Sequence, residues 1–230
     1  MEKEQFEIFH KILTKLNDSG SLNELILIGS WCLPIYSKIY SGNTEIQMLR
    51  TKDIDFLVKN PRNIYKPINI DSVLQEIGFE PTFDTSSILK KYDMNGFDLE
   101  FLSARIRGNE KIIKIPQLSI TAQVLDYMEI AVQYAMETEY IGIKLKIPEL
   151  PAYVLHKAIV QTLRTNEVKK EKDAATVASL GRLIAELPDL QTRTIQIFNK
   201  FPKSWQKIVL KMVKIHSPEL KEFFTRTLTH

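Results

Sequence analysis

Two aspartates separated by a single residue, Asp53 and Asp55, stand in the stretch DIDFLV. Side chains two residues apart on a β-strand point to the same face, so a strand here places the two carboxylates within about 7 Å of each other. Like charges this close repel, and a divalent cation bound by both carboxylates relieves the repulsion. The pair therefore predicts a site for Mg²⁺ or Mn²⁺, although an exposed acidic strand face is the alternative.

A second acidic pair, Asp98 and Glu100, stands in FDLEFL and also shares one face of a predicted strand. If the two strands are neighbours, three carboxylates converge. We favour Glu100 over Asp98 as the third one, because an apolar pair follows Glu100 as it follows Asp55, and because the longer side chain can reach a shared metal. Hard cations in such an oxygen cage hold a triphosphate and activate an attacking hydroxyl in phosphoryl or nucleotidyl transfer.

The apolar run LILI ends in Gly29 and Ser30, and Pro34 follows soon after. A glycine at the end of a strand lets the backbone approach a ligand closely. If a helix begins there, free N–H groups and the Ser30 hydroxyl can bind phosphate oxygens, and Pro34 fits the first turn because its missing N–H costs little. We expect Gly29 and Ser30 to bind nucleotide phosphates; a plain turn is the alternative.

The elements that must position these residues follow from the apolar spacing. Strands are predicted at 24–28, 51–59 and 97–102, and the pair Asn95-Gly96 indicates a hairpin before the last of them. Within 121–147, alternation from Ile130 onward favours a strand that pairs with 140–148, and a helix is the alternative. From Pro151 onward the pattern is helical, with breaks near Pro188, Pro202 and Pro218.

The predicted fold class is therefore α+β. A mixed sheet with flanking helices occupies residues 1–148, and a helical domain occupies residues 149–230. The chain has 230 residues, of which 44% are hydrophobic and 26% charged, as in ordinary soluble globular proteins. No apolar run approaches the roughly 18 residues of a membrane span. The single cysteine, Cys32, rules out an internal disulfide and a Cys-rich zinc site. We expect a cytoplasmic protein that does not bind membranes.

The net charge of +3 is unevenly distributed. Residues 1–148 hold 17 Lys and Arg against 20 Asp and Glu, whereas residues 149–230 hold 14 against 8. A basic half beside an acidic half could attract a phosphate-bearing ligand. A solvated basic helical face is the alternative.

The order of these motifs resembles the nucleotidyltransferase superfamily, which has the DNA polymerase beta-like fold. Its pattern is an apolar strand ending in Gly-Gly or Gly-Ser, an Asp-x-Asp strand and a third acidic strand residue. GSWCLPIY, RTKDIDFLV and FDLEFL look more narrowly like an uncharacterised bacterial group of nucleotidyltransferases. PAYVLHKAIVQTLR and KKEKDAATVASL resemble the helices after the catalytic core in that group and in the AbiEii-type toxin enzymes. The resemblance spans about residues 22–180.

The resemblance implies a role for each matching residue. Gly29 and Ser30 would bind nucleotide phosphates, Asp53 and Asp55 would hold the metals, and Glu100 or Asp98 would be the third carboxylate, which also takes the acceptor's proton. In the helical half, the recurring lysine and Lys-Asp pair match Lys157, Lys172 and Asp173, and Lys157 is expected to reach a phosphate. Twenty-two residues separate Ser30 from Asp53, more than in the smallest members of the superfamily. An extra turn or loop over 37–50 is expected, which leaves open whether Arg50 and Lys52 contact phosphate.

Together these features predict a metal-dependent nucleotidyltransferase. It would use Mg²⁺ or Mn²⁺ to move a nucleoside monophosphate from a nucleoside triphosphate to an acceptor hydroxyl, with release of pyrophosphate. The acceptor could be a small molecule, a protein side chain or an RNA end. Nucleic acid is not favoured, because the basic half shows no aromatic-rich platform for single strands. The alternative is a non-catalytic regulator or antitoxin-like binding protein of the same fold, against which the intact acidic set argues.

Overall fold

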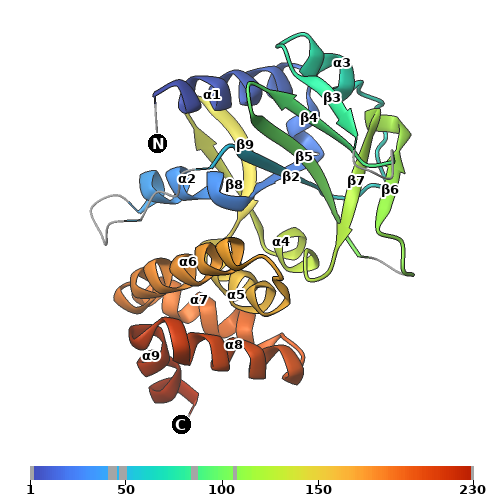
Figure 1. Ribbon diagram of the computed structural model, residues 1–230. Helices are drawn as coiled ribbons and strands as arrows, with labels where there is room; N and C mark the ends of the chain where they lie inside the picture. The colour runs from blue at the N-terminus through green and yellow to red at the C-terminus, as the bar shows by residue number, and fades with distance from the viewer. Residues whose placement is uncertain (1–2, 41–45, 47–50, 84–87, 106–107, 229–230) are drawn as a thin grey trace. The chain divides into compact units, whose positions relative to one another are not determined.

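A computed structural model describes residues 3–40, 46, 51–83, 88–105 and 108–228 (Figure 1). The described chain forms two compact units. Residues of 1–35 and 48–148 make up the first, and residues of 36–47 and 149–230 make up the second. The domains expected from the sequence differ from these units in the placement of 36–47.

The first unit is built on a mixed sheet that has seven strands in the described part of the chain. They are β1 (Leu25–Ile28), β2 (Asp53–Val58), β3 (Glu80–Phe83), β4 (Lys90–Met94), β5 (Phe97–Ala104), β6 (Ile112–Ile115) and β7 (Ile120–Leu125). β2 runs antiparallel to β1 and parallel to β5. β5 pairs with β4 through its first residues and with β7 through its last. The predicted mixed sheet is confirmed, and the two acidic strands, β2 and β5, are neighbours in it.

One face of the sheet is held by aromatic and aliphatic side chains. Phe56 of β2 and Phe101 of β5 are fully buried with ring centroids 6.3 Å apart, and Tyr92 of β4 meets Phe101 edge-on. Figure 1 shows α1 (Lys3–Asp18) and α3 (Ile70–Gln75) along one side of the sheet. α1 is amphipathic, and its apolar stripe, which includes Phe9 and Leu13, is buried.

The opposite face carries a second apolar cluster. It contains Ile26 and Ile28 of β1 and Leu57 and Leu102 of the neighbouring strands, and it packs against the start of α4 (Glu129–Gln133). The register places these residues on the same face as the carboxylates of β2 and β5, further toward the ends of the two parallel strands. This face is therefore divided between an apolar part and an acidic part.

Two hairpins complete the first unit. Asn95 and Gly96 both have positive φ, 54° and 77°, as the turn of a two-residue hairpin requires, so the predicted hairpin between β4 and β5 is confirmed. The ambiguous stretch 121–147 contains both expected element types. α4 is followed by β8 (Ala135–Tyr140), which pairs with β9 (Ile143–Pro148) in a separate two-stranded sheet. Each alternative was therefore right for part of the stretch.

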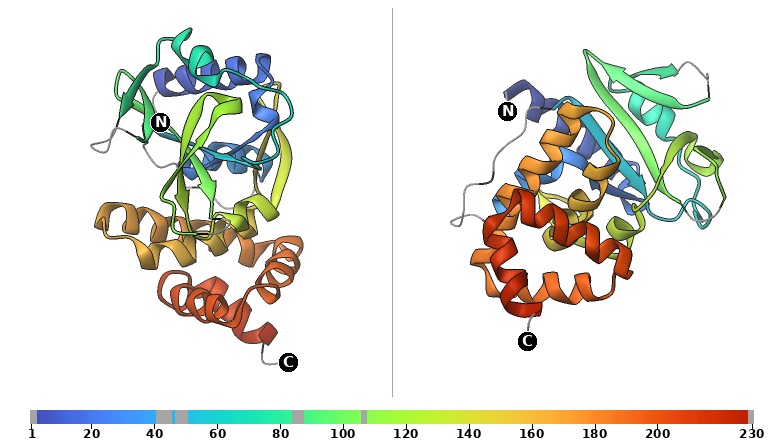
Figure 2. Two further views of the ribbon diagram at one scale, coloured as in Figure 1. Left: turned by 90° about the vertical axis from the view of Figure 1, so that its right-hand side faces the viewer. Right: turned by 60° about the horizontal axis from the view of Figure 1, so that its bottom comes forward.

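The second unit is helical, as expected. α5 contacts α6, α7 and α8, and almost all of its residues are buried. Figure 2 shows the helices of this unit, in orange to red, from two further sides. The expected breaks are confirmed, because new helices begin at Pro188 and Pro218 and directly after Pro202. The helices are α5 (Leu150–Val160), α6 (Glu167–Glu186), α7 (Pro188–Asn199), α8 (Lys203–His216) and α9 (Pro218–Leu228).

Among the residues that the structure describes, no helix has the length and apolar character needed to cross a membrane.

Close packing at Gly181 of α6 gives a prediction about stability. A Cβ at this position would lie 2.5 Å from Oγ and 3.0 Å from Cβ of the buried Ser217. Alanine normally stabilises a helix by about 1 kcal/mol relative to glycine, but overpacking costs about 1–3 kcal/mol. We expect Gly181→Ala to lower the free energy of unfolding in urea by about 1 kcal/mol. In a Ser217→Gly background, where the space is free, the same change should be neutral or stabilising. A more stable single variant would contradict this packing.

Candidate active site

The four acidic residues singled out in the sequence lie together on one face of the sheet. In the parallel pairing of β2 and β5, Asp53 is level with Asp98 and Asp55 is level with Glu100. Partners in register on neighbouring strands point to the same side. We call this set, Asp53, Asp55, Asp98 and Glu100, the acidic face. Glu100, the favoured third carboxylate, is thus the direct neighbour of Asp55.

The Gly29-Ser30 turn lies against the acidic face. β1 runs antiparallel to β2 with Ile28 level with Asp55, so the chain leaves β1 beside that carboxylate. Gly29 has a φ of +73°, and a Cβ there would stand 2.5 Å from Oδ2 of Asp55. Only glycine satisfies both the backbone conformation and the space. The backbone at Gly29 therefore approaches Asp55 of the DxD pair closely, whereas its expected approach to a ligand stays a prediction.

A buried aromatic side chain anchors this turn. Residues Gly29–Trp31 form a 3₁₀ turn that leads into α2 (Cys32–Ile39), where Pro34 sits in the first turn as expected. Trp31 is fully buried, stacks on Phe9 at 4.1 Å between ring centroids and meets Phe6 edge-on. Gly29 and Ser30 themselves are only half-buried. The buried Trp31 thus holds the turn in place, while Gly29 and Ser30 keep part of their surface exposed.

Lys91 of β4 forms an ion pair with the acidic face. Its Nζ lies 2.8 Å from Oε2 of Glu100. Burial disfavours the charged amine, but the hydrogen bond and charge of Glu100, with the charges of Asp98 and Asp55, outweigh it and raise the pKa of Lys91. Lys91 does not stand out in the sequence by itself. The hairpin indicates its position, because a two-residue Asn95-Gly96 turn places Lys91, four residues before the turn, opposite Glu100, four residues after it.

Asp98 is in an unfavourable electrostatic position for a carboxylate. Burial and the charges of Asp53, Asp93 and Glu100 raise its pKa, against the opposing charge of Lys91. A carboxyl whose pKa is raised by folding binds its proton more tightly in the folded state, so its contribution to stability is lost as the pH rises through that folded pKa. When it is ionised, Asp98 therefore adds to the repulsion on this face.

The chemistry of the acidic face fits a hard divalent cation, since all its donors are carboxylate oxygens. The side chains do not yet form a complete cage. In the described part of the chain, no three His, Cys, Asp or Glu side chains stand together as a ready metal site. Glu100 is paired with Lys91 instead. Asp53 and Asp55 would provide the first ligands, and a third carboxylate would have to turn toward them.

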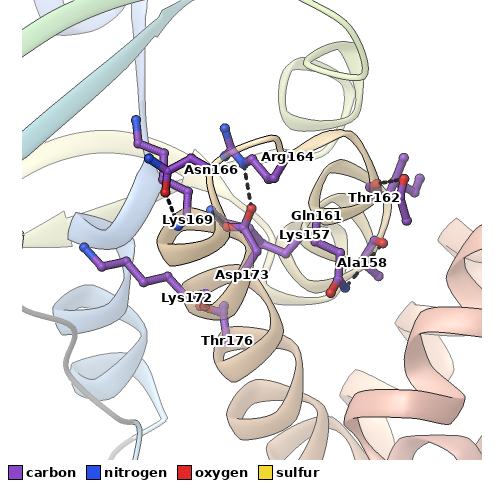
Figure 3. Close-up of polar contacts among 11 residues, drawn as sticks. Lys157, Ala158, Gln161, Thr162, Arg164, Asn166, Lys169, Lys172, Asp173 and Thr176 are labelled. Carbon is purple, nitrogen blue, oxygen red and sulfur yellow. Dashed lines mark hydrogen bonds and ion pairs between the residues drawn. The ribbon is translucent and has the colours of Figure 1, made fainter.

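The helical residues matched by the resemblance form a buried cluster of their own. Asp173 of α6, with 4% of its side chain exposed, accepts hydrogen bonds from Nζ of Lys157 at 2.6 Å and from Nε of Arg164 at 2.9 Å (Figure 3). Burial raises the pKa of Asp173, but the charges and hydrogen bonds of the two bases outweigh it and leave it lowered. Arg164 was missed because it lies in the irregular segment between α5 and α6. Lys172 extends away from Asp173 (Figure 3).

Three further basic residues differ in what the structure shows of them. Nζ of Lys52 lies 3.5 Å from the carbonyl oxygen of Asn95 and over the Phe97 ring, so it is directed toward the hairpin turn. Arg50 lies outside the described residues. His156 is buried, and burial, followed by the charge of Lys157, lowers its pKa to about 3. It is therefore neutral near pH 7 and belongs to the interior of the helical unit.

Two solved structures are similar to this chain in their overall course. An antigenic nucleotidyltransferase-like protein from Paracoccidioides brasiliensis has 18% identity and a TM-score of 0.44, with 90% of this chain and 94% of that chain covered. The antibiotic-resistance factor ANT(2'')-Ia has 10% identity and a TM-score of 0.38, with 100% and 95% covered. A comparison with curated proteins gives no match. The family model described as nucleotidyltransferase matches residues 7–196, more than three quarters of the chain, and the chain therefore belongs to the nucleotidyltransferase family.

Proposed function

We propose that this protein is a metal-dependent nucleotidyltransferase that moves a nucleoside monophosphate from a nucleoside triphosphate to an acceptor hydroxyl. One observation carries the proposal. The pairing of β1 with β2 and of β2 with β5 brings the Gly29-Ser30 turn, the Asp53/Asp55 pair and Glu100 to one place on the sheet. These three parts are the ones that a triphosphate and its cation require.

In this proposal the Gly29-Ser30 turn binds the triphosphate through backbone N–H groups and the Ser30 hydroxyl. Asp53 and Asp55 hold Mg²⁺ or Mn²⁺. The ion supplies charge neutralisation on the phosphates and lowers the pKa of a bound hydroxyl. Trp31, fixed between Phe6 and Phe9, keeps the turn at its place beside Asp55.

The transfer itself needs a group that accepts a proton. The acceptor oxygen forms a bond to the α-phosphorus, the bond to the bridging oxygen breaks, and pyrophosphate leaves with that electron pair. The hydroxyl proton passes to a carboxylate, for which Glu100 is the candidate. Glu100 is level with Asp55 and has 17% of its side chain exposed, whereas Asp98 is level with Asp53 and is exposed.

The acceptor is a small molecule, a protein side chain or an RNA end. The narrower likeness to AbiEii-type enzymes, and a bacterial origin with it, stays a prediction from the sequence. So does the alternative of a regulator that binds a nucleotide without turning it over. Labelling of an acceptor from an α-³²P nucleoside triphosphate separates catalysis from binding.

Transfer of the α-phosphate tests the proposed reaction. With cell extract, Mg²⁺ and each nucleoside triphosphate, the protein should label an acceptor from α-³²P but not from γ-³²P substrate. Glu100→Gln should lower the rate by about 10²–10⁴-fold because it cannot take the proton, while substrate binding is largely retained. Asp98→Asn, the matched control on the same strand, should cost about tenfold or less. Binding without any labelling would favour the regulator, and a larger loss in Asp98→Asn would reverse the two roles.

Metal binding tests the role of the DxD pair. Calorimetry with Mg-ATP should show binding to the wild-type protein and its loss in the Asp53→Asn/Asp55→Asn double variant. Without metal, the double variant should melt at the same temperature as the wild type or higher, because two repelling charges are gone. Equal Mg-ATP affinity of the two proteins would show that the cation binds elsewhere.

Lys157 was expected to contact a phosphate, and its pairing with Asp173 gives it a structural role as well. Lys157→Met should lower the free energy of unfolding by about 1.5–3 kcal/mol, as for a hydrogen bond between charged groups. If the phosphate role is right, affinity for the triphosphate should also fall by about 1–2 kcal/mol. Arg164→Met removes the other partner of Asp173 and should affect stability alone. Destabilisation by Lys157→Met with unchanged affinity would rule out the phosphate contact.

A further inference from the structure

Lys91 occupies an unusual position for a basic residue. It lies on β4 across from the middle of β5, where its ammonium pairs with Glu100 at 2.8 Å. Asp98 and Asp55 also act on its charge. Within the described residues, it is the base whose ion pair with the acidic face is observed. The positive charge that four neighbouring carboxylates require is thus partly supplied by the chain itself.

The geometry of this pair determines what a metal ion would encounter. Glu100 has 17% of its side chain exposed, and its Oε2 is buried and has the ion pair with Lys91 as its contact, without an aligned hydrogen bond. Lys91 has 37% exposed, so the ammonium can leave toward solvent without opening the core. Glu100, by contrast, cannot serve a cation on Asp53 and Asp55 with this oxygen while Lys91 holds it.

Two cations then compete for one carboxylate. The ammonium of Lys91, 2.8 Å from Glu100 and acted on by the charge of Asp55, also repels an arriving divalent ion, and in a partly buried site this repulsion is screened less than in water. A metal ion alone must overcome both effects. A metal ion that arrives with a triphosphate brings phosphate oxygens as further ligands. The net charge of this complex is negative, so the ammonium of Lys91 attracts the complex instead of repelling it.

We propose that Lys91 is a positioning residue that acts as the resident counter-ion of the acidic face and is exchanged for the metal when the nucleotide complex binds. This inference rests on the proposed function. In the metal-free protein Lys91 holds Glu100 and reduces the repulsion among the carboxylates. When the metal–triphosphate complex arrives, Glu100 turns to the metal, and the ammonium gives up its ion pair with Glu100 while it stays attracted to the negative complex. The arrangement makes the site respond to the metal–nucleotide complex in preference to the free ion.

The matched control for this proposal lies one residue away. Lys90 is on the opposite face of β4 and pairs with Asp71 at 3.2 Å. Lys90→Met and Lys91→Met therefore remove the same charge and one ion pair from the same strand, on different faces. Lys91→Arg keeps the charge and should behave as the wild type does.

Mn²⁺ binding without nucleotide, measured by electron paramagnetic resonance, tests the proposal together with thermal unfolding. Lys91→Met should bind Mn²⁺ about tenfold more tightly than the wild type, because the competing charge is absent. It should melt at a lower temperature without Mn²⁺ and gain more from its addition. Lys90→Met should bind Mn²⁺ with the affinity of the wild type, within about twofold, whatever its melting temperature.

The outcomes separate this inference from the proposed function. Unchanged or weaker Mn²⁺ binding by Lys91→Met overturns the role of Lys91, and if the wild type still binds Mn²⁺ with α,β-methylene-ATP the proposed function stands. Equal tightening in Lys90→Met overturns it too, because net charge would then explain the effect. If none of the proteins binds Mn²⁺, even with α,β-methylene-ATP, both the exchange and the metal-dependent function are wrong.

Discussion

Repulsion between carboxylates is the constraint on which the rest of the first unit depends. Asp53, Asp55, Asp98 and Glu100 are forced together by the parallel pairing of β2 and β5, and that pairing is fixed by the other face of the same strands. Phe56 and Phe101 are fully buried there. A shift of one residue would bring acidic side chains into the core and aromatic ones to the surface. Hydrophobic burial therefore holds in place charges that would otherwise separate.

The charges, in turn, explain the features around them. The backbone of Gly29 can approach the Asp55 carboxylate because glycine has no side chain that would intervene. An N–H group or a cation next to that carboxylate is favourable, whereas a second carboxylate there is unfavourable. Lys91 gives part of the missing positive charge from the neighbouring strand. Burial, together with the charges of Asp53, Asp93 and Glu100, still raises the pKa of Asp98 against the opposing charge of Lys91. The charge of the acidic face is thus compensated by the chain only in part.

The sequence was informative where a short local rule determines geometry. The Asn95-Gly96 turn, the shared face of each acidic pair and the strand that ends at Gly29 all follow from backbone preferences that involve few residues. It was less informative where tertiary contacts decide. The alternation after Ile130 suits a strand, but the first residues of that stretch cover the apolar cluster on β1 as a short helix. Arg164 reaches Asp173 from an irregular segment, for which no periodicity exists. Lys91 was overlooked although the hairpin rule already placed it.

The hairpin between β4 and β5 has a consequence for how this protein can change. Its turn contains two residues, and the length of this turn determines which residue of β4 lies opposite which residue of β5. One residue inserted at the turn would reverse the face of every side chain on β4 relative to β5. Lys91 would then point toward the interior and Tyr92 toward solvent, with no residue of the acidic face altered. Loop length is commonly the most variable property among related proteins, but here it should be invariant, since the turn sets which charges meet.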